Sequence, residues 1–385
     1  MTKRRILGIT AIRSEYFLQR PVFDAIQQHP DLELALIVTG AHLSPLHNYT
    51  VRTIEKDGYP IAARVENLIN SDRDAARLKG AATQLQIVAH LVDELRPDWL
   101  LVPADREESI VLSMCGAYLG LPIAHYGAGD RVVGNVDDMI RHAVSRLAHL
   151  LLTSNEPSRE RLIRAGEQEW RVHNVGSSGL DRIRKTPTLT SKELAAALDV
   201  AQIEPEYFLV LQHPLSSEAA KAGEQMMLTL EAVTSLNAQT FVIYPNSDPG
   251  SGEIIRVIET YRSHPKVHVF KNIPDVPFIN LLRGAAALVG NSSLGLMEAP
   301  FLKLAVVNVG HRQQSRLHTE NVFFVDHDVP AITGQLNAIR SDPATKERVA
   351  SCSNPFGDGF AGERIAEILA TTSIDSKLLN KDLTY

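Results

Sequence analysis

Cysteine is almost absent from this chain. Only two cysteines occur among its 385 residues, Cys115 and Cys352, and their spacing fits no metal-binding motif. This scarcity argues against a disulfide framework and against a structural zinc site. A chain with so few thiols is typical of a reducing compartment, and we therefore expect a cytoplasmic protein.

Long apolar runs and an excess of basic charge are also missing. No apolar run approaches the roughly 18–20 residues that a membrane-spanning helix needs. The N-terminal MTKRRILGITAIR has only a short apolar run before Arg13, which predicts a first strand and not a signal peptide. The formal net charge is −6, so no broad basic surface for nucleic acid is implied. We expect neither a membrane nor a nucleic acid as a partner.

The composition and the length of the chain predict a soluble protein with two domains. The hydrophobic fraction is 44% and the charged fraction 22%, and 385 residues are too many for one ordinary core. Short apolar runs alternate with helical patterns, which is the rhythm of a parallel α/β sheet. The rhythm stops in a stretch that is rich in Pro, Thr, Ser and Ala, and then restarts. We predict Rossmann-like domains at 1–184 and 205–370, a linker at 185–204 and a frayed tail at 371–385.

Acidic residues and histidines gather in one passage of the first half. Asp105 and His125 each follow a predicted strand, so they should lie at the same edge of a parallel sheet, where α/β folds place ligand contacts. Titratable residues packed between apolar runs usually indicate a site, and we predict that this passage holds the catalytic groups. Its titratable residues include Asp105, His125, Asp130, Asp137, Asp138, His142 and His149.

Two neighbouring acids open the predicted helix of this passage. Asp137 and Asp138 precede apolar residues at helical spacing, so they could simply cap the helix and offset its dipole. Asp138 and His142 lie four residues apart and should face the same way. Both interpretations of the acids, cap and catalyst, stay open. The spacing of the acids and histidines fits no strong metal motif, so we predict no metal ion.

A strand-to-helix loop in the second half predicts an anion pocket. The segment GNSSLG spans residues 290–295, and backbone N–H groups at such a helix start can hold a phosphate. No lysine follows as in a Walker A loop, and the GxGxxG dinucleotide fingerprint is absent. The alternative is a plain serine cap. Glu298 falls in the first turns of the predicted helix, within reach of a sugar hydroxyl, and Arg312 and Arg316 follow close by.

The motifs of the chain, taken together, resemble the UDP-N-acetylglucosamine 2-epimerase family, and most of all its hydrolysing branch, which feeds sialic-acid-type sugar synthesis. The matching segments of the first half are Arg13 with Ser-Glu-Tyr, TGAHL at 39–43, DREE at 105–108 and DDMIRHAVSRLAHL at 137–150. Those of the second half are LQHP at 211–214, PNSDPG at 245–250, VGNSSLGLMEAP at 289–300, and GHRQQSR at 310–316 followed by TENV. They occur in family order and cover most of the chain.

The resemblance implies a GT-B architecture, with two Rossmann-like domains facing a central cleft and the nucleotide held mainly by the C-terminal one. It also implies that UDP-N-acetylglucosamine is converted to free N-acetylmannosamine and UDP. The C2 proton and UDP are eliminated, and water then adds with inversion at C2. A positioned base must remove the proton, and positive charge must stabilise the departing diphosphate. The family further implies a homodimer or tetramer that uses no cofactor.

Site residues carry over from the matched positions. Asp105 and Asp137 match catalytic acids of the family, and Arg13, His213 and Arg312 match positions that face the diphosphate. The catalytic set implied is Asp105, Asp130, Asp137, Asp138, His142 and His213. The set implied to bind the UDP-sugar is Arg13, His42, Arg106, Asn246, Asn272, Asn291, Ser292, Ser293, Gly295, Glu298 and Arg312. For His42, an ordinary loop histidine is the alternative.

One departure from the family pattern bears on the substrate. Several members carry a glutamate two residues after the histidine matched by His125, where this chain has Gly127. Either Asp130 supplies the missing carboxylate, or this branch acts on another sugar. The alternative substrates are UDP- or GDP-linked 2,4-diacetamido-trideoxyhexoses, and the alternative reactions are non-hydrolysing epimerisation and, more remotely, GT-B glycosyl transfer.

Overall fold

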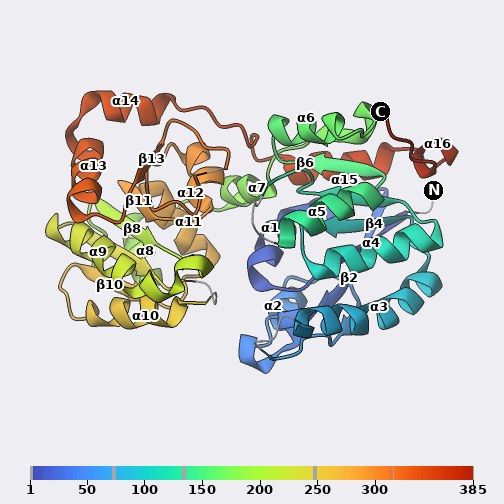
Figure 1. Ribbon diagram of the computed structural model, residues 1–385, viewed down its shortest axis with the longest axis horizontal. Coiled ribbons are helices and arrows are strands. Elements are labelled where there is room, and N and C mark those ends of the chain that lie inside the picture. The colour runs from blue at the N-terminus through green and yellow to red at the C-terminus, as the bar shows by residue number, and fades with distance from the viewer. Residues whose placement is uncertain (1–2, 72–74, 132–135, 246–248, 315, 385) are drawn as a thin grey trace. The chain divides into compact units, whose positions relative to one another are not determined.

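The computed structural model describes residues 3–71, 75–131, 136–245, 249–314 and 316–384. The chain divides into two compact units, and the first unit is discontinuous in sequence. It comprises residues 1–184 together with 355–385, whereas the second unit comprises residues 185–354. Figure 1 shows α15, in red near the C-terminus, among the green and blue elements of the first unit.

The first unit is built on a parallel sheet. Within the described residues its seven strands follow the order β3-β2-β1-β4-β5-β6-β7. The strands are β1 (Arg4–Thr10), β2 (Leu32–Thr39), β3 (Ile61–Val65), β4 (Trp99–Pro103), β5 (Ile123–Tyr126), β6 (Leu150–Thr153) and β7 (Val172–Asn174). The helices are α1 (Arg13–Gln28), α2 (Val51–Lys56), α3 (Ala75–Leu95), α4 (Glu107–Leu119), α5 (Val136–Leu147), α6 (Glu156–Arg164), α7 (Ser178–Lys185), α15 (Ala361–Thr371) and α16 (Ser376–Leu379). Short 3-10 turns are η1 (Gly40–Leu43), η2 (Pro45–His47) and η3 (Glu169–Arg171).

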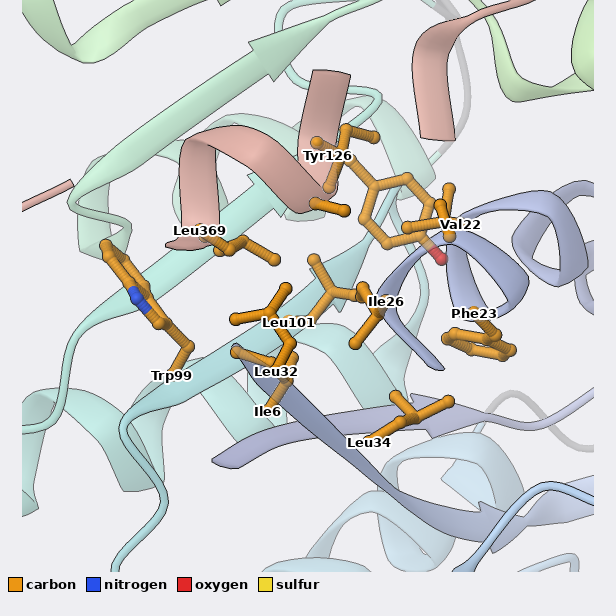
Figure 2. Close-up of a cluster of buried hydrophobic side chains, with 14 of the residues drawn as sticks. Ile6, Val22, Phe23, Ile26, Leu32, Leu34, Trp99, Leu101, Tyr126 and Leu369 are labelled. Atoms are coloured by element: carbon orange, nitrogen blue, oxygen red, sulfur yellow. The ribbon is translucent and has the colours of Figure 1, made fainter. Parts of the chain in front are cut away.

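The central strands of this sheet are apolar because helices cover both faces. All residues of β4, β5 and β6 are buried, which is typical of parallel strands between two helical layers. On one face the cluster includes Ile6, Ile26 and Leu101, and Figure 2 shows Leu369 of α15 pointing into it. The C-terminal helix therefore completes the core of the first unit.

This packing corrects two of our expectations about domain limits. The second domain does not reach residue 370, because the apolar face of α15 is buried against α1 and the first sheet. The polar tail is not frayed either. The Lys381 amine donates to the carbonyls of Ser145 at 2.9 Å and Ala148 at 2.8 Å, at the end of α5. It also pairs with the buried Glu167 at 2.7 Å, so the tail is anchored to the first unit.

The second unit repeats the plan with a smaller parallel sheet. Its strand order is β10-β9-β8-β11-β12-β13 within the described part of the chain. The strands are β8 (Tyr207–Leu211), β9 (Gln239–Ile243), β10 (Val267–Phe270), β11 (Ala287–Gly290), β12 (Val306–Val309) and β13 (Val322–Val325). The helices are α8 (Ser191–Leu198), α9 (Ala222–Ser235), α10 (Ser251–Thr260), α11 (Asp275–Gly284), α12 (Leu294–Met297), α13 (Val329–Ser341) and α14 (Pro343–Ser351). The 3-10 turns are η4 (Ser216–Lys221) and η5 (Ala299–Leu302).

The stretch 185–204, which we expected to be a linker, belongs to the second unit. Its helix α8 begins with a capping box, in which Thr190 and Glu193 each bond the other's backbone N–H. Leu194 and Leu198 are buried with Tyr207 in the core of this unit. A Leu/Ala-rich amphipathic helix needs a surface to cover, and here the sheet of the second unit provides it.

None of the helices in the described ranges combines the length and the apolar character needed to cross a membrane. All strands of both sheets pair in parallel, so each unit has one edge where every strand ends. The described residues of the predicted polar loops lie at these two edges.

Candidate active site

At the carboxyl edge of the first sheet, Asp105 is held by a buried arginine. The chain turns sharply after β4 at Ala104, whose φ is +27°. The carbonyl of Ala104 accepts a hydrogen bond from Nε2 of the buried His125 at 2.7 Å. Asp105 then forms an ion pair with Arg141 of α5, which also donates to the carbonyl of Gly127 at 2.9 Å. The predicted meeting of Asp105 and His125 at one edge is confirmed.

Asp130 is fixed at the end of the neighbouring strand β6. It accepts hydrogen bonds from Ser154 Oγ at 3.1 Å and Ser158 Oγ at 2.7 Å, and from Asn155 Nδ2 at 3.1 Å. Arg141 Nη1 lies 3.5 Å from its other oxygen, so the same guanidinium joins Asp105 and Asp130. Two carboxylates thus share one buried cation. The Asp130 side chain has little conformational freedom and suits a positioning role as well as a chemical one.

The start of α5 brings further titratable groups to this edge. The carboxylate of Asp137 lies 3.5 Å from Arg77 of α3. Burial and then the nearby charge of Asp105 raise the pKa of Asp137, while Arg77 lowers it. Asp138 and His142 are 3.8 Å apart, which confirms the prediction that they face the same way on this helix. The arrangement allows Asp137 to carry a proton closer to neutral pH than an ordinary aspartate does.

The loop from β4 into α4 adds a second arginine with two glutamates. Arg106 Nε donates to Glu108 at 3.0 Å, and its Nη2 donates to Glu107 at 3.2 Å. Burial raises the pKa of Glu108. The pKa of Glu107 lies below its usual value: burial opposes this, but the hydrogen bond from Arg77 and the charge of Arg106 outweigh it. Arg106, predicted to contact substrate, is thus engaged with the acids of its own loop.

Glu15 joins this group from the first turn of α1, and sequence reasoning missed it. Strand β1 pairs with β4, so the turn after β1 and the loop after β4 share one edge of the sheet. Glu15 is only partly covered as a residue, but its carboxyl is enclosed beside Arg106, Glu108 and Asp105. Burial raises the pKa of Glu15 to about 8. At neutral pH its carboxyl is therefore protonated and can donate a hydrogen bond.

We expect the thermal stability of the protein to depend on the protonation of Glu15. A carboxyl with a pKa of 4.5 when unfolded and about 8 when folded stabilises the fold fully below pH 4.5, and that stability is lost as the pH rises through 8. Glu15→Gln should therefore lose less thermal stability than the parent between pH values of about 5 and about 8. Melting curves in matched buffers test this, with the exposed Glu94→Gln as the control. Equal losses in Glu15→Gln and the parent would contradict it.

The structure places the predicted residues Arg13 and His42 in different surroundings. Arg13 is exposed at the start of α1, and its guanidinium lies over the Phe17 ring, 5.4 Å from the centroid. His42 is fully buried, with hydrogen bonds to Thr10 at 3.2 Å and Thr50 at 2.7 Å. Burial lowers the pKa of His42 to about 4, so the ring is neutral. This geometry favours a role in holding two loops together over a direct ligand contact.

His149 lies at the opposite end of the sheet from the acids. Its ring accepts a hydrogen bond from the Ile123 backbone at 3.1 Å, at the start of β5. Sequence proximity grouped it with the acidic passage, but a short strand separates it from the edge that carries Asp130. His149, which we named only as a titratable residue of this passage, therefore does not lie with the acids.

In the second unit, Asn291 joins three neighbouring strand ends. Its side chain accepts from the His213 N–H at 2.7 Å and donates to the His213 carbonyl at 2.9 Å, which fixes the loop after β8. Its own carbonyl accepts from Arg312 at 3.2 Å and Gln313 at 2.9 Å, in the loop after β12. The preceding Gly290 has φ +130°, and a Cβ there would lie 2.2 Å from the Leu211 carbonyl oxygen. The predicted set His213, Asn291 and Arg312 is therefore brought together.

The helix after this loop is shorter than expected. Helix α12 spans only Leu294–Met297, and Ser293 at its start makes no capping hydrogen bond with its side chain. The alternative of a plain serine cap is therefore not supported. Glu298 lies at the end of α12 and not in its first turns, and it is buried. Ser292 is also buried, directly before Ser293.

The remaining predicted residues have diverse positions. A Cβ at Gly295 would lie 2.8 Å from Val306 Cγ1, so this glycine allows α12 to approach the sheet closely. Asn272 is exposed in the loop after β10. Asn246 lies outside the described residues. No group of acidic, histidine or cysteine side chains in the described part of the chain could hold a metal ion.

Two arginines that organise the first edge, Arg77 and Arg141, were not singled out from the sequence, and neither was Glu15. Arg141 lay inside the quoted segment DDMIRHA, and Glu15 followed Arg13 in another quoted segment, so both could have been found there. Arg77 had no such signal, because it lies in no recognised motif. The edge can hold and transfer protons between carboxyl groups, and the loops of the second unit can bind an anion with N–H groups and Arg312.

Comparisons with known proteins agree with this chemistry. The model of the UDP-N-acetylglucosamine 2-epimerase family matches residues 24–370. The UDP-N,N'-diacetylbacillosamine 2-epimerase (hydrolyzing) of Legionella pneumophila is 33% identical over 99% of this chain and 100% of its own. The GDP/UDP-N,N'-diacetylbacillosamine 2-epimerase (hydrolyzing) of Campylobacter jejuni is 31% identical over 84% of each chain.

Solved structures show the same fold at lower identity. A UDP-GlcNAc 2-epimerase from Methanocaldococcus jannaschii, in complex with UDP-GlcNAc and UDP, superposes with a TM-score of 0.76. It is 16% identical and covers 96% of this chain and 100% of its own. The likeness confirms the predicted α/β architecture of the GT-B type.

Proposed function

Because this chain belongs to the UDP-N-acetylglucosamine 2-epimerase family, we propose that it is a hydrolysing 2-epimerase of a UDP-linked 2-acetamido sugar. The network of carboxylates and arginines at the edge of the first sheet carries this proposal, since removal and return of the C2 proton require positioned acids and bases. The preferred substrate is a UDP-linked 2,4-diacetamido-trideoxyhexose. The Legionella and Campylobacter relatives, both named for diacetylbacillosamine, support this substrate over UDP-N-acetylglucosamine itself.

The proposed reaction has two steps. In the first, a base takes the proton from C2 while the C1–O bond to UDP breaks, which leaves a glycal-like double bond between C1 and C2. In the second, water adds its oxygen to C1 and a proton returns to C2 from the opposite face. The balance is UDP-sugar plus water to free 2-epimer plus UDP.

The two leading acids have surroundings that suit different roles. Asp105 is ion-paired with Arg141, which holds its carboxylate in a fixed position for a role as the base. Asp137, whose pKa burial raises, suits the return of a proton during hydration. Asp130 is held 3.5 Å from the same Arg141 and orients that guanidinium. The assignment of Asp130 as a substitute for the family glutamate stays a prediction.

The second unit supplies the groups for the diphosphate. Negative charge grows on UDP as the C1–O bond breaks, and N–H donors or an arginine lower the energy of that state. Arg312 lies against the Asn291 carbonyl, beside Ser292 and Ser293, where it can meet a phosphate. Cytoplasmic location and a homo-oligomeric state stay predictions.

Product analysis by NMR in D2O tests the function. Incubation with the UDP-linked diacetamido sugar, without any acceptor, should release UDP and the free 2-epimer with deuterium at C2. The GDP-linked sugar and UDP-N-acetylglucosamine serve as parallel substrates and should turn over more slowly. A C2 epimer still bound to UDP would show a non-hydrolysing epimerase, and release of UDP only with an acceptor would show a glycosyltransferase.

A further inference from the structure

Arg77 of α3 bridges the starts of two other helices. Its Nη2 donates to Glu107 Oε2 at 2.6 Å and its Nε to Glu107 Oε1 at 3.3 Å. The guanidinium therefore binds the first residue of α4 in a bidentate manner. The same Nη2 lies 3.5 Å from Asp137 Oδ1 in the first turn of α5. Glu107 in turn accepts from Arg106 at 3.2 Å. The result is a row of alternating charges that ends on Asp137.

This geometry gives Arg77 a defined orientation. A planar guanidinium bound by two nitrogens to one carboxylate loses little further freedom when it meets a second one. The contact between Arg77 and Asp137 is longer, at 3.5 Å. Arg77 can therefore orient the Asp137 carboxylate while that carboxylate stays available for proton transfer. Arg106 and Arg141 have carboxylate partners of their own in Glu108 and Asp105.

The charge on Asp137 depends on several neighbours. Burial and Asp105 raise the pKa of Asp137, and Arg77 and Arg106 lower it. A positive charge at Arg77 therefore offsets the negative charge at Asp105. The charged groups that act on Asp137 are Arg77 from α3 and Asp105 and Arg106 from the loop after β4. Glu107, at the start of α4, pairs with the same Arg77. The first turns of α5 also carry Asp138, Arg141 and His142.

We propose that Arg77 is a positioning residue for proton transfer, which fixes the Asp137 carboxylate beside Asp105 and stabilises its negative charge. This rests on the proposed function, in which Asp137 transfers a proton. Arg77 lies outside the sequence segments that carry the family resemblance. Through the contact between Arg77 and Asp137, a residue of α3 influences proton transfer by a residue of α5.

Replacing Arg77 with methionine keeps an unbranched side chain of similar apolar character near the backbone but removes the charged guanidinium. In the pH profile of kcat, the limb that reflects Asp137 should move to higher pH, because Arg77 no longer lowers the pKa of Asp137. The shift should be about one unit or less, because Arg77 is half-exposed and solvent screens its charge. KM should stay within about threefold, since the proposal gives Arg77 no contact with substrate. Arg77→Lys should return the limb towards its original position.

Arg64→Met is the matched control. Arg64 also pairs with a glutamate, Glu55, at 2.7 Å, and its side chain is 51% exposed against 49% for Arg77. It lies on β3, outside the acidic group, and its loss should leave kcat, KM and the pH profile unchanged. Melting temperatures of all variants separate loss of fold from loss of positioning.

A second measurement keeps the proposal independent of turnover. Carboxyl carbon NMR of protein labelled at aspartate, with the Asp137 signal assigned through Asp137→Asn, reports the pKa of Asp137 directly. The pKa should rise in Arg77→Met and return in Arg77→Lys. An unchanged Asp137 titration in folded Arg77→Met would overturn the role of Arg77. Absence of turnover in the parent protein would instead overturn the proposed function and leave this titration intact.

Discussion

Asp105→Asn will lower kcat by about 10²–10⁴-fold, the range that a general acid or base contributes, and will leave UDP affinity within about twofold. Asparagine has the shape of aspartate and can still accept a hydrogen bond from Arg141, but it cannot take up a proton. Most of the residues expected to hold UDP belong to the second unit, so binding should persist. Release of UDP in a coupled assay measures turnover, and calorimetric titration measures the affinity for UDP.

Asp98→Asn is a suitable control for this variant. Asp98 precedes the same strand, β4, whose far end leads to Asp105, and its carboxylate accepts the Arg5 N–H at 2.7 Å. The change is chemically identical but lies at the opposite edge of the sheet, so turnover should not change. If Asp105→Asn kept the parent's turnover, Asp105 would lose its proposed role as the base.

Replacing Arg312 with methionine will weaken UDP binding by about 10- to 100-fold, because a hydrogen bond to a charged group contributes roughly 1.5–3 kcal/mol. Arg312 lies beside the N–H groups after β11, so it can neutralise a diphosphate there. Arg312→Lys should retain part of the affinity, since it keeps the charge but loses the planar fork. The affinity of the parent should fall as salt rises, and that of Arg312→Met should fall less.

Arg340→Met controls for the loss of a cation from the second unit. Arg340 binds Glu206 with two nitrogens, at 2.9 and 2.8 Å, on α13 and away from the strand-end loops. Its removal should leave the affinity for UDP unchanged. Equal affinities for Arg312→Met and the parent would show that the diphosphate binds elsewhere.

The sequence predicted what depends on local pattern. Strands followed by polar loops placed Asp105 and His125 correctly, because parallel strands end at a shared edge whatever the rest of the chain does. The spacing of Asp138 and His142 was enough to predict that they share one face of a helix, since four residues make about one helical turn. The loop around Gly290 was recognisable for the same reason, although the length of the helix after it was not.

Contacts between distant segments were not predictable in this way. Arg77 reaches Asp137 across 60 positions of the chain, and no periodicity links them. The pattern of α15 indicates an amphipathic helix, but the same pattern would fit either sheet. Helix α15 covers an apolar face of the first sheet together with α1. The local sequence of α15 carries no information about that face.

The return of residues 355–385 to the first sheet makes the second unit an insert within the first. A gene fragment that stops at residue 184 would lack α15. The face of the first sheet that carries Ile6 and Leu101 would then be without the helix that helps to bury it. The insert 185–354 is continuous and has its own core, so it is the segment to express alone for nucleotide titrations.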